Sequence, residues 1–335
     1  MITLKTFQNR DTRIYLNPRL HPKDTQFLLD IFETIRPKIP NHLVLSTSGT
    51  SQLKLVAIDK SKILIAASRV NASISASDDD RWLNPLPLFH MGGISIYARA
   101  QLSHAKVFNL EKWSVTKCIE SIHTNRISLI SLVPTQLFDL VMQESKCPRT
   151  IRHVFVGGAS LSETIYSRAI ALGWPIIRCY GMTETAAQIM AEGIVYPHVK
   201  VRINTNNILE VKSDALLTGY GIVDQNGDII LRDPKSSDGW FTTGDLAKWN
   251  KNGRLEILGR AENVIKVSGE IVNLQRLNQL FDDAKLNVKF QGNAILTAVK
   301  DERLGYKIVV ESDSNCEQAI KHYNQRCLPF EKVVS

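Results

Sequence analysis

The sequence predicts an α/β protein with a large N-terminal domain over residues 1–259 and a small, mobile α+β C-terminal domain over residues 260–335. Three observations lead to this prediction. Apolar strand-like runs alternate with helix signals up to about residue 193, short strands and tight-turn signals fill residues 194–259, and a helix with two strands follows. Alternation is typical of a mostly parallel sheet, whereas the turn-rich stretch is typical of an antiparallel β subdomain.

The first region contains clear helix signals. Asp24 can cap a helix whose apolar residues recur at helical spacing as far as Ile35. Pro134 suits the first position of a helix that continues to residue 142, and residues 160–163 have a capping-box pattern. We expect strands at residues 43–46, 128–133, 153–156 and 176–179.

The later regions have a different texture. Short strands are expected at residues 208–211, 228–231 and 255–258, with tight turns at Asn226-Gly227 and Asn252-Gly253. A domain boundary falls near Gly259-Arg260, because a helix over residues 274–281 and strands at residues 294–299 and 307–310 come after it.

Composition excludes several classes of protein. Of 335 residues, 44% are hydrophobic and 22% charged, which is ordinary for a globular protein, and no stretch approaches the roughly 20 apolar residues of a membrane span. The net charge of +8 suits an anionic partner, but the basic residues are scattered and no nucleic-acid-binding motif occurs. Five scattered cysteines without a CxxC pair argue against disulfides and structural zinc, so we expect a cytoplasmic protein. Oligomeric state cannot be inferred.

The common nucleotide and hydrolase motifs, GxxxxGK[ST], GxGxxG, HExxH and GxSxG, are absent from the chain. A hydroxyl-rich run, Ser46-Thr47-Ser48-Gly49-Thr50-Ser51, instead follows a predicted strand, and Lys54 comes shortly after it. Its backbone N–H groups and hydroxyls could surround a polyphosphate, to which Lys54 would add a positive charge. The alternative is a plain polar loop.

Two further runs place carboxylates at suggestive positions. Tyr180-Gly181-Met182-Thr183-Glu184-Thr185 follows a predicted buried strand, where ligands of α/β sheets bind, and its carboxylate suits Mg²⁺. The alternative is a helix capped by Thr183. Asp245, at the end of a Thr-Gly-Asp run, could accept hydrogen bonds from both hydroxyls of a ribose; the alternative is an aspartate in a turn. Residues 259–270 put cations and glycines at the suspected domain boundary, or form only a charged linker.

Taken in order, these runs resemble the adenylate-forming superfamily of acyl- and aryl-CoA ligases, luciferases and peptide-synthetase adenylation domains. The resemblance extends from about Leu43 to Lys332. It implies a reaction in which a carboxylic acid and ATP form an acyl-adenylate and pyrophosphate. The small domain then rotates, and the thiol of CoA takes the acyl group to give a thioester. Mg²⁺ accompanies ATP in this chemistry, and the partners are small molecules only.

The resemblance also implies roles for individual residues. His90, Lys54, Thr183 and Glu184 would be catalytic, Glu184 would also bind Mg²⁺, and Glu262 would occupy the hinge. Lys266 and Gly269 would line the channel for the thiol. ATP and the adenylate would contact Thr47, Ser48, Gly49, Thr50, Gly157, Gly158, Ala159, Tyr180, Gly181, Asp245 and Arg260.

The sequence departs from the superfamily pattern in three places. The phosphate loop is one residue short before Lys54, and it comes early in the chain, as in compact ligases for o-succinylbenzoate. The run Ser268-Gly269-Glu270 is similar to a run of those ligases, which makes o-succinylbenzoate the expected acid. The superfamily's C-terminal Gly-Lys element does not occur, so we expect a shortened chain or weak adenylation. Another aryl or fatty acid, a carrier-protein acceptor, and a weakly catalytic nucleotide-binding protein remain alternatives.

Overall fold

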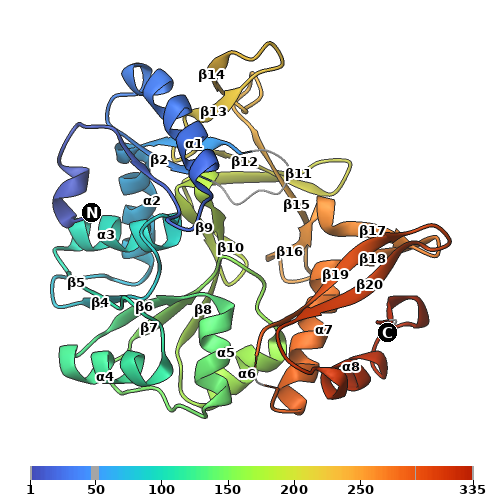
Figure 1. Cartoon of the computed structure of the whole chain (residues 1–335). Helices are drawn as coiled ribbons and strands as arrows, with labels where there is room; N and C mark the ends of the chain where they lie inside the picture. Colours follow the sequence, from blue (N-terminus) through green and yellow to red (C-terminus); the bar gives the residue numbers. More distant parts are fainter. Residues whose placement is uncertain (1, 47–52, 291, 334–335) are drawn as a thin grey trace.

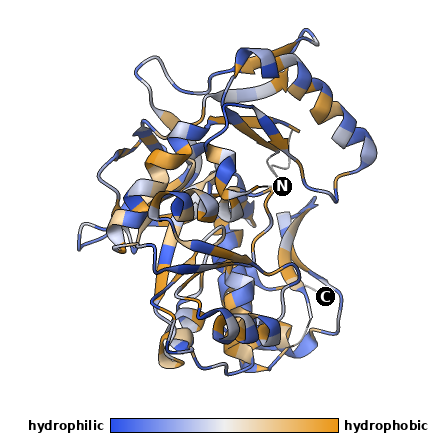
Figure 2. Ribbon diagram, turned by 90° about the vertical axis from the view of Figure 1, so that its left-hand side faces the viewer, coloured by the Kyte–Doolittle hydropathy of each residue, from blue (hydrophilic) through white to orange (hydrophobic). Residues whose placement is uncertain are grey.

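The computed structural model describes residues 2–46, 53–290 and 292–333. Figure 1 shows an α/β body that contains the N-terminus and, beside it, the C-terminal segment with β17–β20, α7 and α8. Hydrophobic residues recur along the strands and helices, and hydrophilic residues dominate many of the connecting loops (Figure 2). In the part of the chain that the structure describes, no helix is long and apolar enough to cross a membrane.

A seven-stranded sheet forms the centre of the α/β body, in the order β10-β9-β8-β7-β6-β4-β5. Its five strands from β5 to β8 are parallel, which confirms the expected mostly parallel sheet, while β9 and β10 join antiparallel. The strands are β4 (Arg81–Asn84), β5 (Lys106–Asn109), β6 (Leu129–Leu132), β7 (His153–Val156), β8 (Ile176–Met182), β9 (Ala187–Ala191) and β10 (Ile194–Val195). The helices that follow or connect them are α2 (Lys60–Ser73), α3 (Met91–Ser103), α4 (Val115–Asn125), α5 (Pro134–Met142) and α6 (Glu163–Ala171).

A second, five-stranded sheet joins segments that are distant in the sequence. Its order is β1-β2-β3-β13-β14, and helix α1 (Pro22–Ile35) packs against it. Strand β13 pairs antiparallel with β3, so residues 219–232 belong to this sheet rather than to the neighbouring antiparallel sheet. The strands are β1 (Arg13–Tyr15), β2 (His42–Ser46), β3 (Leu55–Asp59), β13 (Gly219–Val223) and β14 (Ile229–Arg232).

A four-stranded antiparallel sheet, in the order β11-β12-β15-β16, completes the body. Its strands are β11 (Val199–Ile203), β12 (Ile208–Ser213), β15 (Phe241–Trp249) and β16 (Leu255–Arg260). The Asn-Gly turns are present, but each lies in a longer loop that starts with an Asx residue. The side chains of Asp224 and Asn250 each accept hydrogen bonds from two backbone N–H groups of their loops, which closes the loop from its first residue.

The C-terminal segment has a hydrophobic core of its own. Phe281 and Tyr323 are fully buried at its centre and pack edge to face. Leu286 is the residue of α7 that instead joins the core beneath the parallel sheet. The elements are β17 (Val264–Val267), β18 (Glu270–Asn273), α7 (Leu274–Asn287), β19 (Ala294–Asp301), β20 (Gly305–Ser312) and α8 (Glu317–Asn324).

Two helices begin at residues other than those predicted. Helix α1 is capped by His21, whose side chain accepts from the N–H of Lys23, so Asp24 lies in the first turn instead of at the cap. Pro22 explains the difference, because proline at the first helical position needs no hydrogen-bond acceptor. Helix α6 is capped by Ser162 rather than by Ser160, since Ser162 accepts from the N–H of Ile165.

Candidate functional site

A cleft of about 1300 Å³ opens at the carboxyl ends of the parallel strands β6, β7 and β8. Helix α3, strands β9, β15 and β16, and the first turns of α7 form its other walls. Ligands of open α/β sheets bind at this end of the strands. The cleft lining includes most of the predicted site residues: Lys54, His90, Gly157, Gly158, Ala159, Tyr180, Gly181, Thr183, Glu184, Asp245, Arg260 and Glu262.

Two of the predicted residues that the structure describes, Lys266 and Gly269, are not among those that line the cleft. Thr47, Ser48, Gly49 and Thr50 lie outside the described residues. Lys266 lies exposed on β17, and Gly269 occupies the turn between β17 and β18 with a φ of 85°. The structure therefore gathers the described residues that were predicted to contact nucleotide, and it leaves the two predicted for the thiol channel on a separate hairpin.

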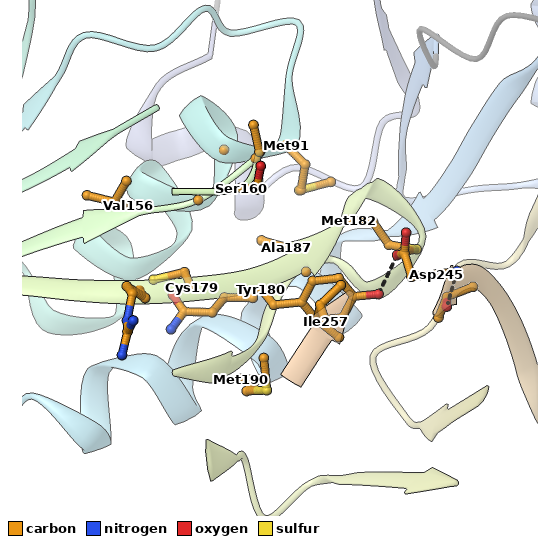
Figure 3. Close-up of a pocket in the computed structure, with 18 of the residues that line it drawn as sticks. Met91, Val156, Ser160, Cys179, Tyr180, Met182, Ala187, Met190, Asp245 and Ile257 are labelled. Carbon is orange, nitrogen blue, oxygen red and sulfur yellow. Dashed lines mark hydrogen bonds between the residues drawn. The ribbon is translucent and has the colours of Figure 1, made fainter. Parts of the chain in front are cut away.

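Asp245 is the best-supported carboxylate of the cleft. The hydroxyl of Tyr180 donates to its Oδ2 at 2.6 Å (Figure 3). Nη1 of Arg260 lies 3.4 Å from its Oδ1. Arg260 also donates to the backbone carbonyl of Thr243, so it is held from two directions. Burial raises the pKa of Asp245, and the bonds from Tyr180 and Arg260 oppose this shift. A buried, fixed carboxylate beside a cation suits recognition of a diol such as ribose.

Lys54, Tyr220 and Glu184 form a second polar group in the cleft. The Tyr220 hydroxyl donates to Oε1 of Glu184 at 3.0 Å, and Nζ of Lys54 lies 4.0 Å from the same oxygen. The ammonium also sits 3.9 Å from the centroid of the Tyr220 ring, a cation–π geometry. Burial lowers the pKa of Lys54, and the Glu184 charge counteracts it. Strand β13 brings Tyr220 here, since Tyr220 pairs with Val56 two residues beyond Lys54.

The described residues contain no group of three or more His, Cys, Asp or Glu side chains that could hold a metal ion by themselves. Mg²⁺ that accompanies a nucleotide does not need such a group, because phosphates and water supply most of its ligands. The single carboxylate of Glu184 next to Lys54 fits a Mg²⁺ that enters with a polyphosphate. It does not fit a permanently bound ion.

Gly181 allows an unusually close approach of two strands. A Cβ at this position would lie 1.8 Å from the backbone oxygen of Ala187 on β9. A glycine is therefore required here on steric grounds. Thr183 does not cap a helix: it begins a 3₁₀ turn, Thr183–Thr185, and the side chain of Thr185 makes the bonds that close the turn.

Sequence reasoning missed a buried cation that also lines the cleft, Arg99. Arg99, on α3, is only 4% exposed and lines the cleft with His90, which precedes the same helix. Nη2 of Arg99 donates to Oε1 of Gln188 at 3.3 Å, its Nε has no hydrogen-bond partner, and no carboxylate pairs with it in the described structure. Burial lowers the pKa of both Arg99 and His90. An arginine within the otherwise uncharged run of residues 91–103 was the available signal.

Comparisons with known proteins identify relatives of this chain. The family model for AMP-binding enzymes matches residues 36–235. A 2-succinylbenzoate–CoA ligase from Staphylococcus epidermidis is 26% identical over 84% of this chain and 62% of its own length. One from Bacillus cereus is 23% identical, over 99% of this chain and 72% of its own. The chain thus spans less than two thirds of the first of these relatives.

Solved structures show the same fold. The o-succinylbenzoate coenzyme A synthetase of Bacillus subtilis in complex with AMP has a TM-score of 0.72 and 21% identity, over 87% of this chain and 64% of that one. Its unliganded form has a TM-score of 0.75 and 18% identity, over 96% and 81%. The family match spans more than half of the 335 residues. The chain belongs to the family of AMP-binding enzymes.

Proposed function

We propose that this protein is an ATP-dependent acid–CoA ligase that converts o-succinylbenzoate, through an acyl-adenylate, into its CoA thioester. The observation that carries the proposal is one cleft with two chemically different ends. At one end a fixed carboxylate and a lysine–glutamate pair suit a nucleoside polyphosphate. At the other a buried arginine without an acidic partner suits an anionic acid.

The nucleotide end supplies positioning and charge. Asp245 would accept hydrogen bonds from the ribose hydroxyls, and Arg260 and Tyr180 keep its carboxylate in place. Lys54 and Thr183 would face the phosphates, where positive charge and N–H or O–H donors stabilise the transition state of phosphoryl chemistry. Mg²⁺ bound with ATP would be held by Glu184 and would neutralise phosphate charge.

The acid end explains the choice of substrate class. o-Succinylbenzoate has two carboxylates, so activation of one leaves the other anionic. Burying an unpaired carboxylate is costly unless a cation meets it, and Arg99 lies buried without an acidic partner in the described structure. The names of the relatives from Staphylococcus epidermidis and Bacillus cereus support the same acid.

The thiol half of the reaction rests on the family resemblance. We assign Glu262 to the hinge, since it follows β16 and its carboxylate lies 3.7 Å from Nε of Arg260. Rotation at this point would carry the hairpin with Lys266 and Gly269 toward the cleft, where His90 borders the acid. CoA is the proposed acceptor.

The decisive experiment separates the two half-reactions. The protein is incubated with ATP, Mg²⁺ and o-succinylbenzoate, and pyrophosphate is measured; CoA is then added and the thioester is sought by mass spectrometry. We expect pyrophosphate release that depends on the acid, and then the thioester. Pyrophosphate without a thioester would point to a carrier-protein acceptor, and turnover only with other aryl or fatty acids would replace the substrate. ATP binding without pyrophosphate release from any acid would refute the ligase.

A further inference from the structure

We propose that Gln188, held in place by Tyr196, is a positioning residue that determines specificity: it orients Arg99 and leaves its positive charge available for the second carboxylate of the acid. This inference rests on the proposed function and adds to it the residues that set the charge of the acid pocket. Gln188 lies on β9 and is 5% exposed.

Within the described part of the chain, the side chains around Arg99 are polar or aromatic and none of them carries a negative charge. Its guanidinium lies 5.0 Å from the ring of Phe155 and 5.6 Å from that of Trp82. The nearby thiol of Cys179 is neutral, because burial raises its pKa to about 12. Burial likewise raises the pKa of the Tyr196 hydroxyl and keeps it neutral. The side chain that hydrogen-bonds the guanidinium is therefore an amide and not a carboxylate.

The donors and acceptors in the hydrogen bonds that link Arg99, Gln188 and Tyr196 follow from which groups carry protons. Arginine can only donate, so the oxygen of the Gln188 amide must face it and the NH₂ must face away. That NH₂ donates to the Tyr196 hydroxyl oxygen at 2.7 Å. The Ser73 hydroxyl donates to the carbonyl of Val70 at 2.7 Å. Its Oγ can therefore only accept from the Tyr196 hydroxyl, which lies 3.4 Å away.

This chain of bonds fixes the amide in one orientation. If the Gln188 amide were flipped, its NH₂ would face the cation and its oxygen would face Tyr196. The Tyr196 hydroxyl would then have to donate to Gln188 instead of to Ser73. The backbone of Arg99 is also held, since Nδ2 of Asn71 donates to its carbonyl at 2.8 Å. Gln188 thus presents a neutral acceptor to one edge of the guanidinium, and Nη1 of Arg99 stays available to a ligand in the cleft.

Gln188→Glu is the informative substitution, because it keeps the shape and puts a negative charge within hydrogen-bond distance of Arg99. The new glutamate should neutralise the charge of Arg99, so the pocket should no longer bind the second carboxylate of the acid. Gln188→Met is the matched neutral variant, since it removes the acceptor without adding charge. Tyr196→Phe removes the group that holds the amide NH₂ and leaves Gln188 itself intact.

The test compares acids that differ by one carboxylate. Binding is measured by calorimetry for o-succinylbenzoate, 4-oxo-4-phenylbutanoate and 2-butanoylbenzoate, and kcat/KM for those that are turned over. We expect Gln188→Glu to lower the affinity by roughly 100-fold for o-succinylbenzoate and for the single-carboxylate acid that keeps the carboxylate facing Arg99, and to change the affinity for the other acid by less than about 3-fold. Gln188→Met and Tyr196→Phe should cost roughly 3- to 10-fold on the same two acids and leave the third within about 3-fold.

Equal losses for all three acids in Gln188→Glu would show a merely structural role and overturn the proposal, as would an unchanged preference for o-succinylbenzoate. Thermal unfolding and ATP affinity of each variant check that the fold is intact. The binding measurement needs no turnover, so its result can contradict the role of Gln188 without contradicting the ligase assignment. Wild-type protein that binds o-succinylbenzoate but releases no pyrophosphate refutes only the ligase. Wild-type protein that binds none of the acids refutes the pocket assignment.

Discussion

At the scale of single residues, Asp245 has the most direct consequence. Asp245→Ala removes the acceptor that we assign to the ribose and leaves Tyr180 and Arg260 without their shared partner. We expect ATP affinity to fall by roughly 10-fold or more, because hydrogen bonds to a charged group are each worth about 1.5–3 kcal/mol. Equilibrium binding of ATP measures the effect. Glu120→Ala, an exposed change on α4 away from the cleft lining, is the control, and an unchanged affinity in Asp245→Ala would remove the ribose assignment.

The same carboxylate predicts a pH dependence. Burial raises the pKa of Asp245 above its usual value of 3.8, so the carboxyl takes up its proton at a higher pH than an exposed aspartate does. The ionised form accepts two hydrogen bonds from a diol, whereas the protonated form accepts fewer. ATP affinity should therefore weaken as the pH falls through this raised pKa. Asp245→Asn should abolish this acidic limb of the profile of ATP affinity against pH. A limb that persists in Asp245→Asn would assign the titration to another group.

The hydroxyl and the ring of Tyr220 make different contacts, and two substitutions separate their effects. Tyr220→Phe removes the bond to Glu184 but keeps the ring against Lys54, whereas Tyr220→Leu removes both contacts. We expect the Phe variant to need a higher Mg²⁺ concentration for ATP binding, by roughly 2- to 10-fold. The Leu variant should also weaken ATP binding at saturating Mg²⁺, since the Lys54 ammonium loses the aromatic ring against which it packs. Titration of ATP binding against Mg²⁺ distinguishes them, and identical behaviour of both variants would contradict the separation.

At the scale of elements, the junction of β8 and β9 depends on Gly181. An alanine Cβ there would lie 1.8 Å from the carbonyl oxygen of Ala187, so Gly181→Ala must displace one strand. The resulting loss should be at least about 2 kcal/mol in the free energy of unfolding, measured by denaturant titration. In Gly92→Ala, by contrast, the nearest neighbour is the flexible side chain of Leu86 at 3.2 Å, and the change should be within about 1 kcal/mol. Equal stabilities for the two variants would contradict the steric argument.

At the scale of the whole molecule, the C-terminal segment has a core separate from those of the body. Phe281 is fully buried there, and Phe281→Ala should cost about 3–5 kcal/mol in the stability of this segment. Hydrogen exchange should rise over residues 264–333 and stay unchanged in the parallel sheet. ATP affinity should remain within a few-fold, because Asp245, Lys54 and Glu184 lie in the body. Increased exchange throughout the chain would show that the two parts unfold as one unit.

Much of the site could be predicted from the sequence because its parts are local. The helix 274–281 and the strands at 43–46, 153–156 and 176–179 recur in the structure within a few residues, as do the Asn-Gly turns, although in longer loops. Tyr180 and Glu184 share one short run, and Asp245 lies in another. Periodicity and short motifs report such neighbours because the residues concerned are adjacent in the chain.

Only the tertiary structure decided which distant residues meet. The sequence by itself determined the fold class, the order of the motifs and the resemblance that they carry. It could not place Tyr220 beside Lys54, because that contact depends on the pairing of β13 with β3 across more than 150 residues. It could not show that Arg99 lies next to Gln188, or that no acidic side chain among the described residues pairs with Arg99. The physical reason is that the charge a ligand meets in a buried pocket is set by which side chains share that pocket, and non-local strand pairing leaves no signal in a single sequence.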